Sequence, residues 1–381
     1  MKHPRMVLVP ALVVAVGLLT SISLPLTSPV RARTTDGVGG KAISPEPRKA
    51  ENAKATRGTK PKKLVIAAAG NIACDPNHPS FNSGRGTKTA CRMKRVSGLL
   101  LNRNGRPRYK TVLALGDNQY VCGGLRAYRR SYGKSWGRVY RVTKPVVGDK
   151  DYRTTLNAPH GTDCTKEFGR AAGFFEYFDD IKKVEPRPAI GRGAGAFYSF
   201  NVPAGCRPTD TVCWHVIALN GNCRKGGGCE SGTPQYSWLQ GDLAAHGSSD
   251  YACTLAFWHW PRFSSGKHGS NPDFDSIWQL LYDHHVDVVL NAHEHLYERF
   301  APQNPNAVRD ARGIRQFTVG TGGASHVKFP SAARLPTSQA SNDDTFGILR
   351  LKIRADSYTW RFVPEPGKTF SDASASPSAC H

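Results

Sequence analysis

The sequence lacks several features that would define other classes of protein. No Cys-x-x-Cys pair occurs, which argues against a zinc ribbon or a thioredoxin-type site. Acidic residues are scarce, with 29 Asp and Glu against 52 Lys and Arg, and the net charge is +23. Beyond the N-terminus, no apolar run approaches the roughly 20 residues of a membrane-spanning helix. The basic residues are scattered, so the charge favours anionic partners without singling out nucleic acid, which we treat as the less favoured partner.

The N-terminal region has the pattern of an exported protein. Residues 1–32 combine a charged start, an apolar centre from Met6 to about Leu19 and a small-residue exit, which is typical of a secretory signal peptide cleaved near Ala32. Residues 33–62 are basic and poor in large apolar side chains, which predicts a disordered linker. Such a linker either lies on an anionic polymer or has no partner. We expect a secreted, extracellular protein whose single folded domain spans 63–381.

Ten cysteines in an exported chain favour disulfides, and the even number leaves no obligatory free thiol. Sequence alone leaves the connectivity open. Proximity along the chain favours five pairs: Cys74 with Cys91, Cys122 with Cys164, Cys206 with Cys213, Cys223 with Cys229, and Cys253 with Cys380.

Short apolar runs alternate with amphipathic stretches through the rest of the chain. Buried strands are predicted at 63–69, 111–115, 142–147, 214–219, 254–258 and 287–290. Helices are predicted between them, at 89–101, 234–246 and 273–285. This alternation predicts an α/β protein with helices outside a sheet, and the succession of strands from 315 to 363 predicts a second, mixed sheet.

Polar residues that bind metals stand where these strands end. They are Asn71 after the first run, Asp117 and Tyr120 after the second, Asp149 to Asp151 after the third, and then His259, His293 and His295. Ligand sites in open α/β sheets form at the carboxyl ends of strands, so these side chains are expected to share one edge. Oxygen and imidazole donors together suit iron, zinc or manganese, whereas calcium takes mainly oxygen.

These motifs, taken in order, resemble a known family. GDNQY at 116–120, GDKD at 148–151, HWP at 259–261 and AHEHLYER at 292–299 are similar to the pattern of calcineurin-like metallophosphoesterases in their purple acid phosphatase branch. The resemblance runs from about 63 to 381 and looks closest to secreted actinobacterial phosphatase-like proteins. It implies a four-layer α/β/β/α sandwich of two mixed sheets flanked by helices, and a phosphoester hydrolase.

The resemblance also implies two divalent or trivalent metal ions and a role for each residue. Asp117 would bridge the metals, with Asn71, Tyr120 and His295 on the first and Asp149, His259 and His293 on the second. Tyr120 as a phenolate would favour a ferric ion. Such a metal pair holds the phosphoryl oxygens and lowers the pKa of a bound water, while His268 would contact phosphate or protonate the leaving group.

Three positions depart from the family pattern. Asn71 stands where the family has Asp, Asp149 stands where it has Asn, and Lys150 replaces a His that would contact the substrate. The first two changes keep the total ligand charge but move it from the first metal to the second. Three interpretations follow: a hydrolase with altered metal preference, a slow single-metal hydrolase, or an inactive relative that binds an anionic ligand such as a phosphorylated polymer.

The same residues also have structural interpretations. Asp117 and Tyr120 fit a strand-to-helix cap, His259 fits a core histidine, and His268 fits an exposed loop residue. Asp151 is assigned a purely structural role. The segment 297–299 is expected to support the histidine loop from behind. Substrate identity, the choice between monoester and diester, and the oligomeric state are not encoded in these motifs.

Overall fold

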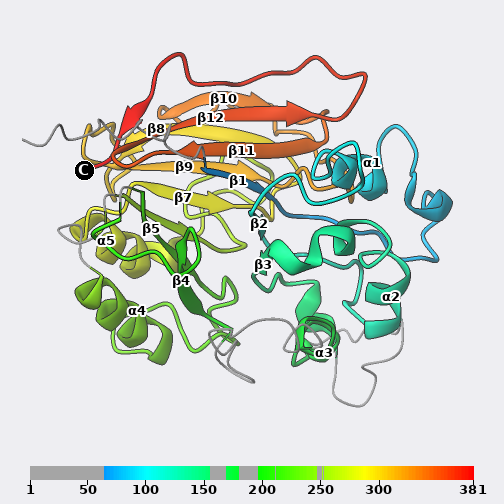
Figure 1. Ribbon diagram of the computed structural model, residues 1–381, viewed down its shortest axis with the longest axis horizontal. Helices are drawn as coiled ribbons and strands as arrows, with labels where there is room; N and C mark the ends of the chain where they lie inside the picture. Colours follow the sequence, from blue (N-terminus) through cyan, green and yellow to red (C-terminus); the bar gives the residue numbers. More distant parts are fainter. Residues whose placement is uncertain (1–63, 155–168, 180–195, 211, 247–250, 252) are drawn as a thin grey trace, which may run out of the picture. The chain divides into compact units, whose positions relative to one another are not determined.

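The predicted apolar runs form the buried strands of two mixed sheets in a computed structural model, which describes residues 64–154, 169–179, 196–210, 212–246, 251 and 253–381 (Figure 1). One sheet has the order β13-β12-β11-β1-β2-β3. Its strands are β1 (Leu64–Ala69), β2 (Thr111–Ala114), β3 (Thr143–Pro145), β11 (Gly347–Ile353), β12 (Ser357–Pro364) and β13 (Ser378–Ala379). Strands β1, β2 and β3 are parallel, and β11 runs antiparallel to β1.

The other sheet has seven strands in the order β10-β8-β9-β7-β6-β5-β4. They are β4 (Tyr198–Val202), β5 (Trp214–Ala218), β6 (Cys253–Phe257), β7 (Val288–Asn291), β8 (Tyr297–Gln303), β9 (Ile314–Val319) and β10 (Ser338–Asn342). Its centre, β5-β6-β7-β9, is parallel, whereas β4, β8 and β10 pair antiparallel at the flanks. The parallel strands of each sheet therefore bring their carboxyl ends to one edge.

Short helices connect the strands. The α-helices are α1 (Met93–Gly98), α2 (Leu125–Arg130), α3 (Ala172–Asp179), α4 (Pro234–Ala245) and α5 (Asp275–Asp283). The 3₁₀ helices are η1 (Asn82–Gly84), η2 (Trp136–Val142), η3 (Asp151–Arg153) and η5 (Pro272–Phe274). The predicted helix over 89–101 is shorter than expected, because Cys91 has a left-handed φ of 60° and is held in a disulfide.

The second sheet is buried on both faces, and its side chains alternate between two cores. Ile66 of β1 and Val216 of β5 share the core between the sheets, whereas Ile217 points into a second core with Leu239 of α4 and Trp278 of α5. This alternation is the two-residue period of a strand. The predicted architecture, two mixed sheets flanked by helices, is confirmed.

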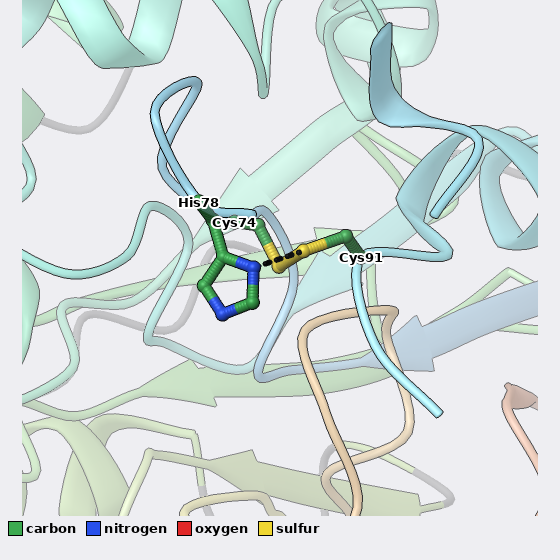
Figure 2. A group of neighbouring side chains, drawn as sticks. All are labelled: Cys74, His78 and Cys91. Carbon is green, nitrogen blue, oxygen red and sulfur yellow. Dashed lines mark hydrogen bonds between the residues drawn. A yellow bond between two sulfur atoms is a disulfide. The ribbon is translucent and has the colours of Figure 1, made fainter. Parts of the chain in front are cut away.

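Four of the five predicted disulfides are confirmed: Cys74–Cys91, Cys206–Cys213, Cys223–Cys229 and Cys253–Cys380. The first lies beside His78 in the loop after β1 (Figure 2). The fifth prediction involves Cys164, which lies outside the described residues. The predicted signal peptide and linker also lie outside them, and the domain boundaries at 32 and 62 stay predictions. In the part of the chain that the structure describes, no helix is both long enough and apolar enough to cross a membrane.

Asp287 is a buried carboxylate that joins the start of β7 to the C-terminal segment. It accepts the Thr254 N–H at 2.8 Å and the His381 N–H at 2.9 Å, and burial raises its pKa to about 7. Because this value is above the ordinary 3.8, the folded protein holds a proton that the unfolded chain loses between about pH 4 and 7. The stability that this proton contributes is present at low pH and is lost as the pH rises towards 7.

We therefore expect Asp287→Asn, which removes the titrating group, to flatten the pH dependence of stability. Between pH 4.5 and 7.5, the unfolding free energy of the wild type should fall relative to the variant by about 1 to 3 kcal/mol. Urea unfolding at several pH values measures this difference. Asp356→Asn is the control, because Asp356 is exposed and its carbonyl bonds the neighbouring Cys380 N–H. Equal pH slopes for the wild type and Asp287→Asn would refute the assignment.

Candidate metal centre

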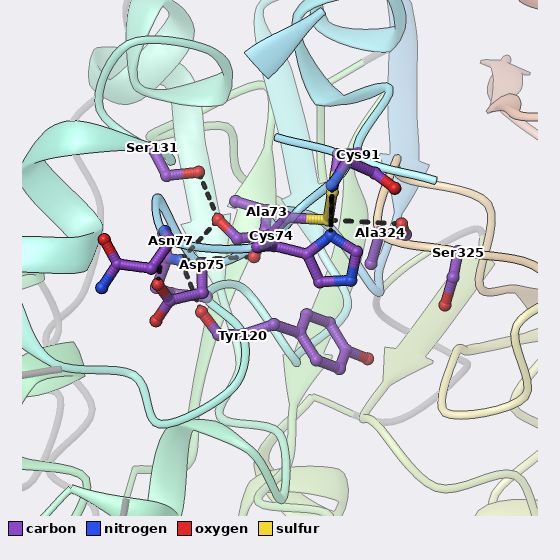
Figure 3. The surroundings of a disulfide bond; sticks show 12 residues. Ala73, Cys74, Asp75, Asn77, Cys91, Tyr120, Ser131, Ala324 and Ser325 are labelled. Atoms are coloured by element: carbon purple, nitrogen blue, oxygen red, sulfur yellow. Dashed lines mark hydrogen bonds between the residues drawn. A yellow bond between two sulfur atoms is a disulfide. The ribbon is translucent and has the colours of Figure 1, made fainter. Parts of the chain in front are cut away.

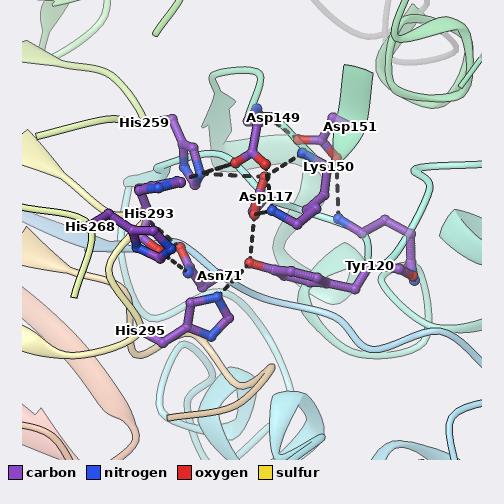
Figure 4. A network of polar contacts seen from close by, with 12 residues as sticks. Asn71, Asp117, Tyr120, Asp149, Lys150, Asp151, His259, His268, His293 and His295 are labelled. Carbon is purple, nitrogen blue, oxygen red and sulfur yellow. Dashed lines mark hydrogen bonds and ion pairs between the residues drawn. The ribbon is translucent and has the colours of Figure 1, made fainter. Parts of the chain in front are cut away.

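Donor side chains from both sheets converge on one site (Figure 4). The first sheet contributes the residues that follow its parallel strands, and the second contributes those that follow β6 and β7. The residues brought together are Asn71, Asp117, Tyr120, Asp149, Lys150, His259, His268, His293 and His295. The sequence predicts that these strand ends meet, and in the structure they do. They come from two sheets, however, and not from one.

Unusual backbone conformations aim these side chains inward. Asn71, Asp117 and His293 have φ values of 55°, 48° and 63°, in the left-handed region that non-glycine residues adopt rarely. Such conformations cluster at functional sites, where the surrounding structure enforces them. Gly116 has a φ of 86°, and a Cβ there would lie 2.6 Å from His259 Nδ1. Glycine is therefore required for the Asp117 turn to approach the His259 loop.

Three donors form a tight group on the side predicted for the second metal. Asp149 Oδ1 lies 3.2 Å from His259 Nε2 and 3.2 Å from His293 Nδ1, and all three residues are buried. His259 Nδ1 donates to the Leu115 carbonyl at 2.8 Å, which leaves Nε2 facing the carboxylates. His259 Nε2 forms ion-pair contacts with Asp149 and, at 3.4 Å, with Asp117. Among the described residues, His293 Nε2 has no hydrogen-bond partner. Buried donors and acceptors are almost always partnered, so the His293 nitrogen points to a ligand.

A second group corresponds to the predicted first metal. The Tyr120 hydroxyl donates to Asp117 Oδ2 at 2.6 Å and lies 3.1 Å from His295 Nε2. His295 Nδ1 faces Ser325, with Oγ at 2.9 Å and the carbonyl at 3.1 Å. The side chains therefore already converge, with the phenol as a neutral donor. Burial and then the Asp117 charge raise the pKa of Tyr120 well above 10.

Asn71 makes a different contact from its neighbours. Its Nδ2 donates to the His293 carbonyl and its Oδ1 accepts the His293 N–H, both at 3.0 Å. The two bonds tie the end of β1 to the histidine loop, 222 residues away. An Asp at this position would have no N–H to give, and its second oxygen would face the carbonyl. The amide therefore positions the His293 backbone, and its oxygen is already engaged by that backbone.

Lys150 places a cation between the two central carboxylates. Its Nζ is paired with Asp149 and lies 3.8 Å from Asp117 Oδ2, while its backbone N–H donates to Asp117 Oδ1 at 2.8 Å. Burial alone would lower the pKa of the ammonium, but the Asp117 and Asp149 charges outweigh it and the net shift is upward. Lys150 therefore stays charged and neutralises part of the site.

The same environment shifts the pKa values of the histidines in opposite directions. Burial lowers the pKa of His295 to about 4 and also lowers that of His293, so both are neutral near pH 7. Neutral imidazole is the form that binds metals. Burial would lower the pKa of His259 too, but the Asp117 and Asp149 charges raise it to about 10. His259 and Lys150 thus balance two buried carboxylates with positive charge.

His268 approaches the site from the loop after β6 and remains partly open to solvent. Its side chain is 44% exposed, and its Nδ1 lies 3.2 Å from Glu294 Oε2. Its backbone N–H donates to Glu294 Oε1 at 2.7 Å. The indole of Trp260 stacks on His293, with ring centroids 3.7 Å apart, and His268 covers the same ring at 4.7 Å. Glu294 and Trp260 are thus part of the site.

Sequence reasoning gave little weight to these two residues. The position of Glu294 between two histidines is a signal that could have found it. Asp151, assigned a structural role, is buried and accepts the Asn118 and Gly148 N–H groups and the Tyr128 hydroxyl. It fixes the two loops that carry Asp117 and Asp149.

The segment 297–299 supports other parts of the molecule. Tyr297 and Arg299 both donate to Asp372. Glu298 accepts the Ser265 N–H, in the loop that leads to His268. The segment 297–299 therefore supports both the loop that leads to His268 and the C-terminal segment.

The residues present fit a metal ion. Asp149, His259 and His293 offer ligand atoms within 4.8 Å of one another, and Asp117 lies 3.4 Å from His259 Nε2. One carboxylate and two imidazoles are a donor set typical of zinc, iron or manganese. On the other side, Asp117, Tyr120 and His295 converge, but Asn71 offers only a neutral oxygen that is already hydrogen-bonded.

Known proteins share both the fold and part of the sequence. Purple acid phosphatase 13 of Arabidopsis thaliana is 29% identical over 211 residues, which cover 54% of this chain and 35% of that protein. Purple acid phosphatase 18 of Arabidopsis thaliana is 33% identical over 198 residues, which cover 49% and 41%. The chain thus spans less than half the length of these relatives. No family profile matches it.

Two solved structures share the fold. Purple acid phosphatase PPD1 from yellow lupin seeds has a TM-score of 0.58 at 15% identity, covering 82% of this chain and 53% of that one. GAP50, described as the anchor in the inner membrane complex of Plasmodium, has a TM-score of 0.56 at 15% identity, covering 84% and 89%. At this identity the likeness shows the fold alone.

The two mixed sheets have the metallophosphatase fold of these structures. The sequence similarities support a likeness to calcineurin-like metallophosphoesterases of the purple acid phosphatase-like branch. The resemblance drawn from the motifs is confirmed, whereas its secreted actinobacterial aspect stays a prediction.

The two-point contact of Asn71 yields a stability test. We expect Asn71→Asp to destabilise the metal-free protein by about 1 to 3 kcal/mol, because one hydrogen bond is lost and two oxygens are opposed. Added Zn²⁺ or Mn²⁺ should reduce this loss, since the new carboxylate can bind a cation. Unfolding with chelator and with metal measures both effects.

The matched control is Asn102→Asp. Its exposed side-chain oxygen accepts the Asn104 and Arg106 N–H groups, and Asp retains both bonds. An Asn71→Asp variant as stable as the wild type in chelator would contradict the positioning role.

Proposed function

We propose that the chain is a metal-dependent phosphoester hydrolase, a phosphatase or phosphodiesterase, whose reaction takes place at the metal centre described above. The single observation that carries the proposal is the buried Asp149, His259 and His293 group, in which two imidazole nitrogens lie 3.2 Å from one carboxylate oxygen. The similarity to purple acid phosphatases supports the same chemistry. The substrate is a phosphoester, either a small molecule or a polymer.

We further propose that this metal centre binds two ions. Asp149, His259 and His293 would hold one ion, Tyr120, His295 and Asn71 the other, and Asp117 would contact both. A metal pair bound there supplies Lewis-acid stabilisation of phosphoryl oxygens and a water of lowered pKa. The neutral state of His293 and His295 suits this role. Asn71 holds the His293 backbone in place, which makes its side chain the weakest member of the ligand set.

The protein's own residues supply the rest of the reaction. His268 is partly exposed and oriented by Glu294, so it can donate a proton to the departing oxygen. The Lys150 ammonium, 22% exposed in the site, can bind a phosphate oxygen. Trp260 covers one face of His293 and keeps water from it.

Secretion remains part of the proposal. The N-terminal pattern and the disulfides are compatible with an oxidising, extracellular compartment. The net charge of +23 favours an anionic substrate or surface.

The proposal predicts metal-dependent turnover. Purified protein should contain about two equivalents of iron, zinc or manganese and should cleave p-nitrophenyl phosphate or its bis ester. His293→Ala removes one of the two imidazoles beside Asp149, so metal content should fall by about one equivalent and turnover on the order of 100-fold or more. Elemental analysis and steady-state kinetics measure the two effects.

His284→Ala is the control, because His284 ends α5 outside the site. Protein that stays free of metal and inactive after reconstitution would overturn the enzyme assignment. It would leave an inactive relative that binds an anionic ligand.

The charge of Lys150 is expected to weaken metal binding. Two positive charges about 5 Å apart repel by about 3 kcal/mol at an effective dielectric of 20, less where solvent screens them. We therefore expect Lys150→Gln to bind Mn²⁺ or Zn²⁺ about tenfold more tightly. Lys150→His, which restores the family residue, should also raise turnover. Titration calorimetry and kinetics give the two readouts.

Lys328→Gln is the control, since Lys328 is 73% exposed and paired with Asp343. Weaker metal binding or lost turnover in both Lys150 variants would mean that the ammonium has a necessary role of its own.

A further inference from the structure

A cavity opens beside the metal centre, on the side of Tyr120. Its volume is about 370 Å³, and its walls include Cys74, His78, Tyr120, Val121, Ala324 and Ser325. Figure 3 shows Ser325 on one side of the Cys74–Cys91 disulfide, Asp75 and Asn77 on the other, and Tyr120 below it. Neither the motifs nor the comparisons assign a role to this cavity.

The cavity and the metal centre share a wall. Tyr120 lines the cavity with its ring, while its hydroxyl lies 2.6 Å from Asp117 Oδ2 and 3.1 Å from His295 Nε2. Ser325 lines it as well, and its Oγ lies 2.9 Å from His295 Nδ1. The cavity therefore adjoins the centre on the side of Tyr120 and Ser325.

The walls are mainly apolar. The apolar part of the lining comes from Cys74, Tyr120, Val121 and Ala324, and the polar part comes from Asp75, Asn77, His78 and Ser325. Val121 is 44% exposed, and in the part of the chain that the structure describes the only other exposed large hydrophobic side chain is Val308. An open apolar side chain beside a polar reaction site is suited to an apolar part of a substrate.

His78 adds a planar surface with a fixed orientation. Its Nδ1 accepts the Ser80 N–H at 3.0 Å and lies 3.4 Å from Cys91 Sγ (Figure 2). Cys74, His78 and Cys91 have the composition of a metal site, but the two sulfurs are bonded to each other and are not thiolates. The imidazole is instead available to lie against a ring.

We propose that this cavity binds the organic group of the phosphoester, and that this group is an uncharged aromatic ring. Asp75 on its wall disfavours an anionic substituent. The inference rests on the proposed function and adds a substrate class to it, aryl phosphoesters. In the reaction, water supplies the new P–O bond, the ester P–O bond breaks, and the leaving aryl oxygen takes one proton.

Two non-hydrolysable probes test the cavity without relying on turnover. Phenylphosphonate and methylphosphonate carry the same anionic group, and only the first fills an aromatic pocket. Calorimetry on metal-loaded protein should find phenylphosphonate bound at least about tenfold more tightly, equivalent to about 1.4 kcal/mol. Val121→Asp should remove most of this ratio, whereas Val308→Asp should leave it unchanged.

Val121→Ser serves as a second variant, in case the charge prevents folding, and should lower the ratio by a smaller factor. If the two phosphonates bind equally, or if neither Val121 variant changes the ratio, the proposed aromatic pocket is refuted. The proposed hydrolase function is then unaffected. If neither phosphonate binds, the proposed pocket is also refuted. Turnover of p-nitrophenyl phosphate then decides whether the proposed function fails with it.

Discussion

The site depends on one electrostatic constraint, the burial of the Asp117 and Asp149 carboxylates side by side. Two buried like charges are costly unless cations or hydrogen bonds compensate them. Lys150 and a protonated His259 provide that compensation, and the backbone of Lys150 adds a hydrogen bond to Asp117. The loops stay in register because Asp151 binds both of them from beneath. A carboxylate pair held this firmly is preorganised for a cation, and the positive side chains are what such a cation must displace.

The apolar strands were predictable because burial on both faces gives continuous hydrophobic runs. The strands β4 and β8 were missed, since their sequences mix polar and apolar residues. The strand-end donors were predictable in kind and in position along the chain. The two-point bond between Asn71 and His293 was not, because it joins residues 222 apart and depends on how the two sheets meet. The cavity beside Tyr120 was missed for the same reason.

If the ligand set is the proposed one, the contacts of Asn71 and Asp149 give a physical account of their difference from the family pattern. The charge inferred to move towards the second metal lies at Asp149, which contacts both His259 and His293. The amide at Asn71 serves the backbone of that same histidine loop. Both changes therefore favour the half of the centre that contains His293. They leave the half around Tyr120 with a phenol, an imidazole and a shared carboxylate.

Fold likeness leaves activity open, because the structures that share this fold include a purple acid phosphatase and a protein described as an anchor. What separates such proteins is the chemistry of the site. Here the hydroxyl of Tyr120 contacts Asp117, and the same residue lines the neighbouring cavity. A ligand that moves the ring must also move the hydroxyl, because the phenol is rigid. In the proposed reaction, metal binding and substrate choice would therefore be coupled through one side chain.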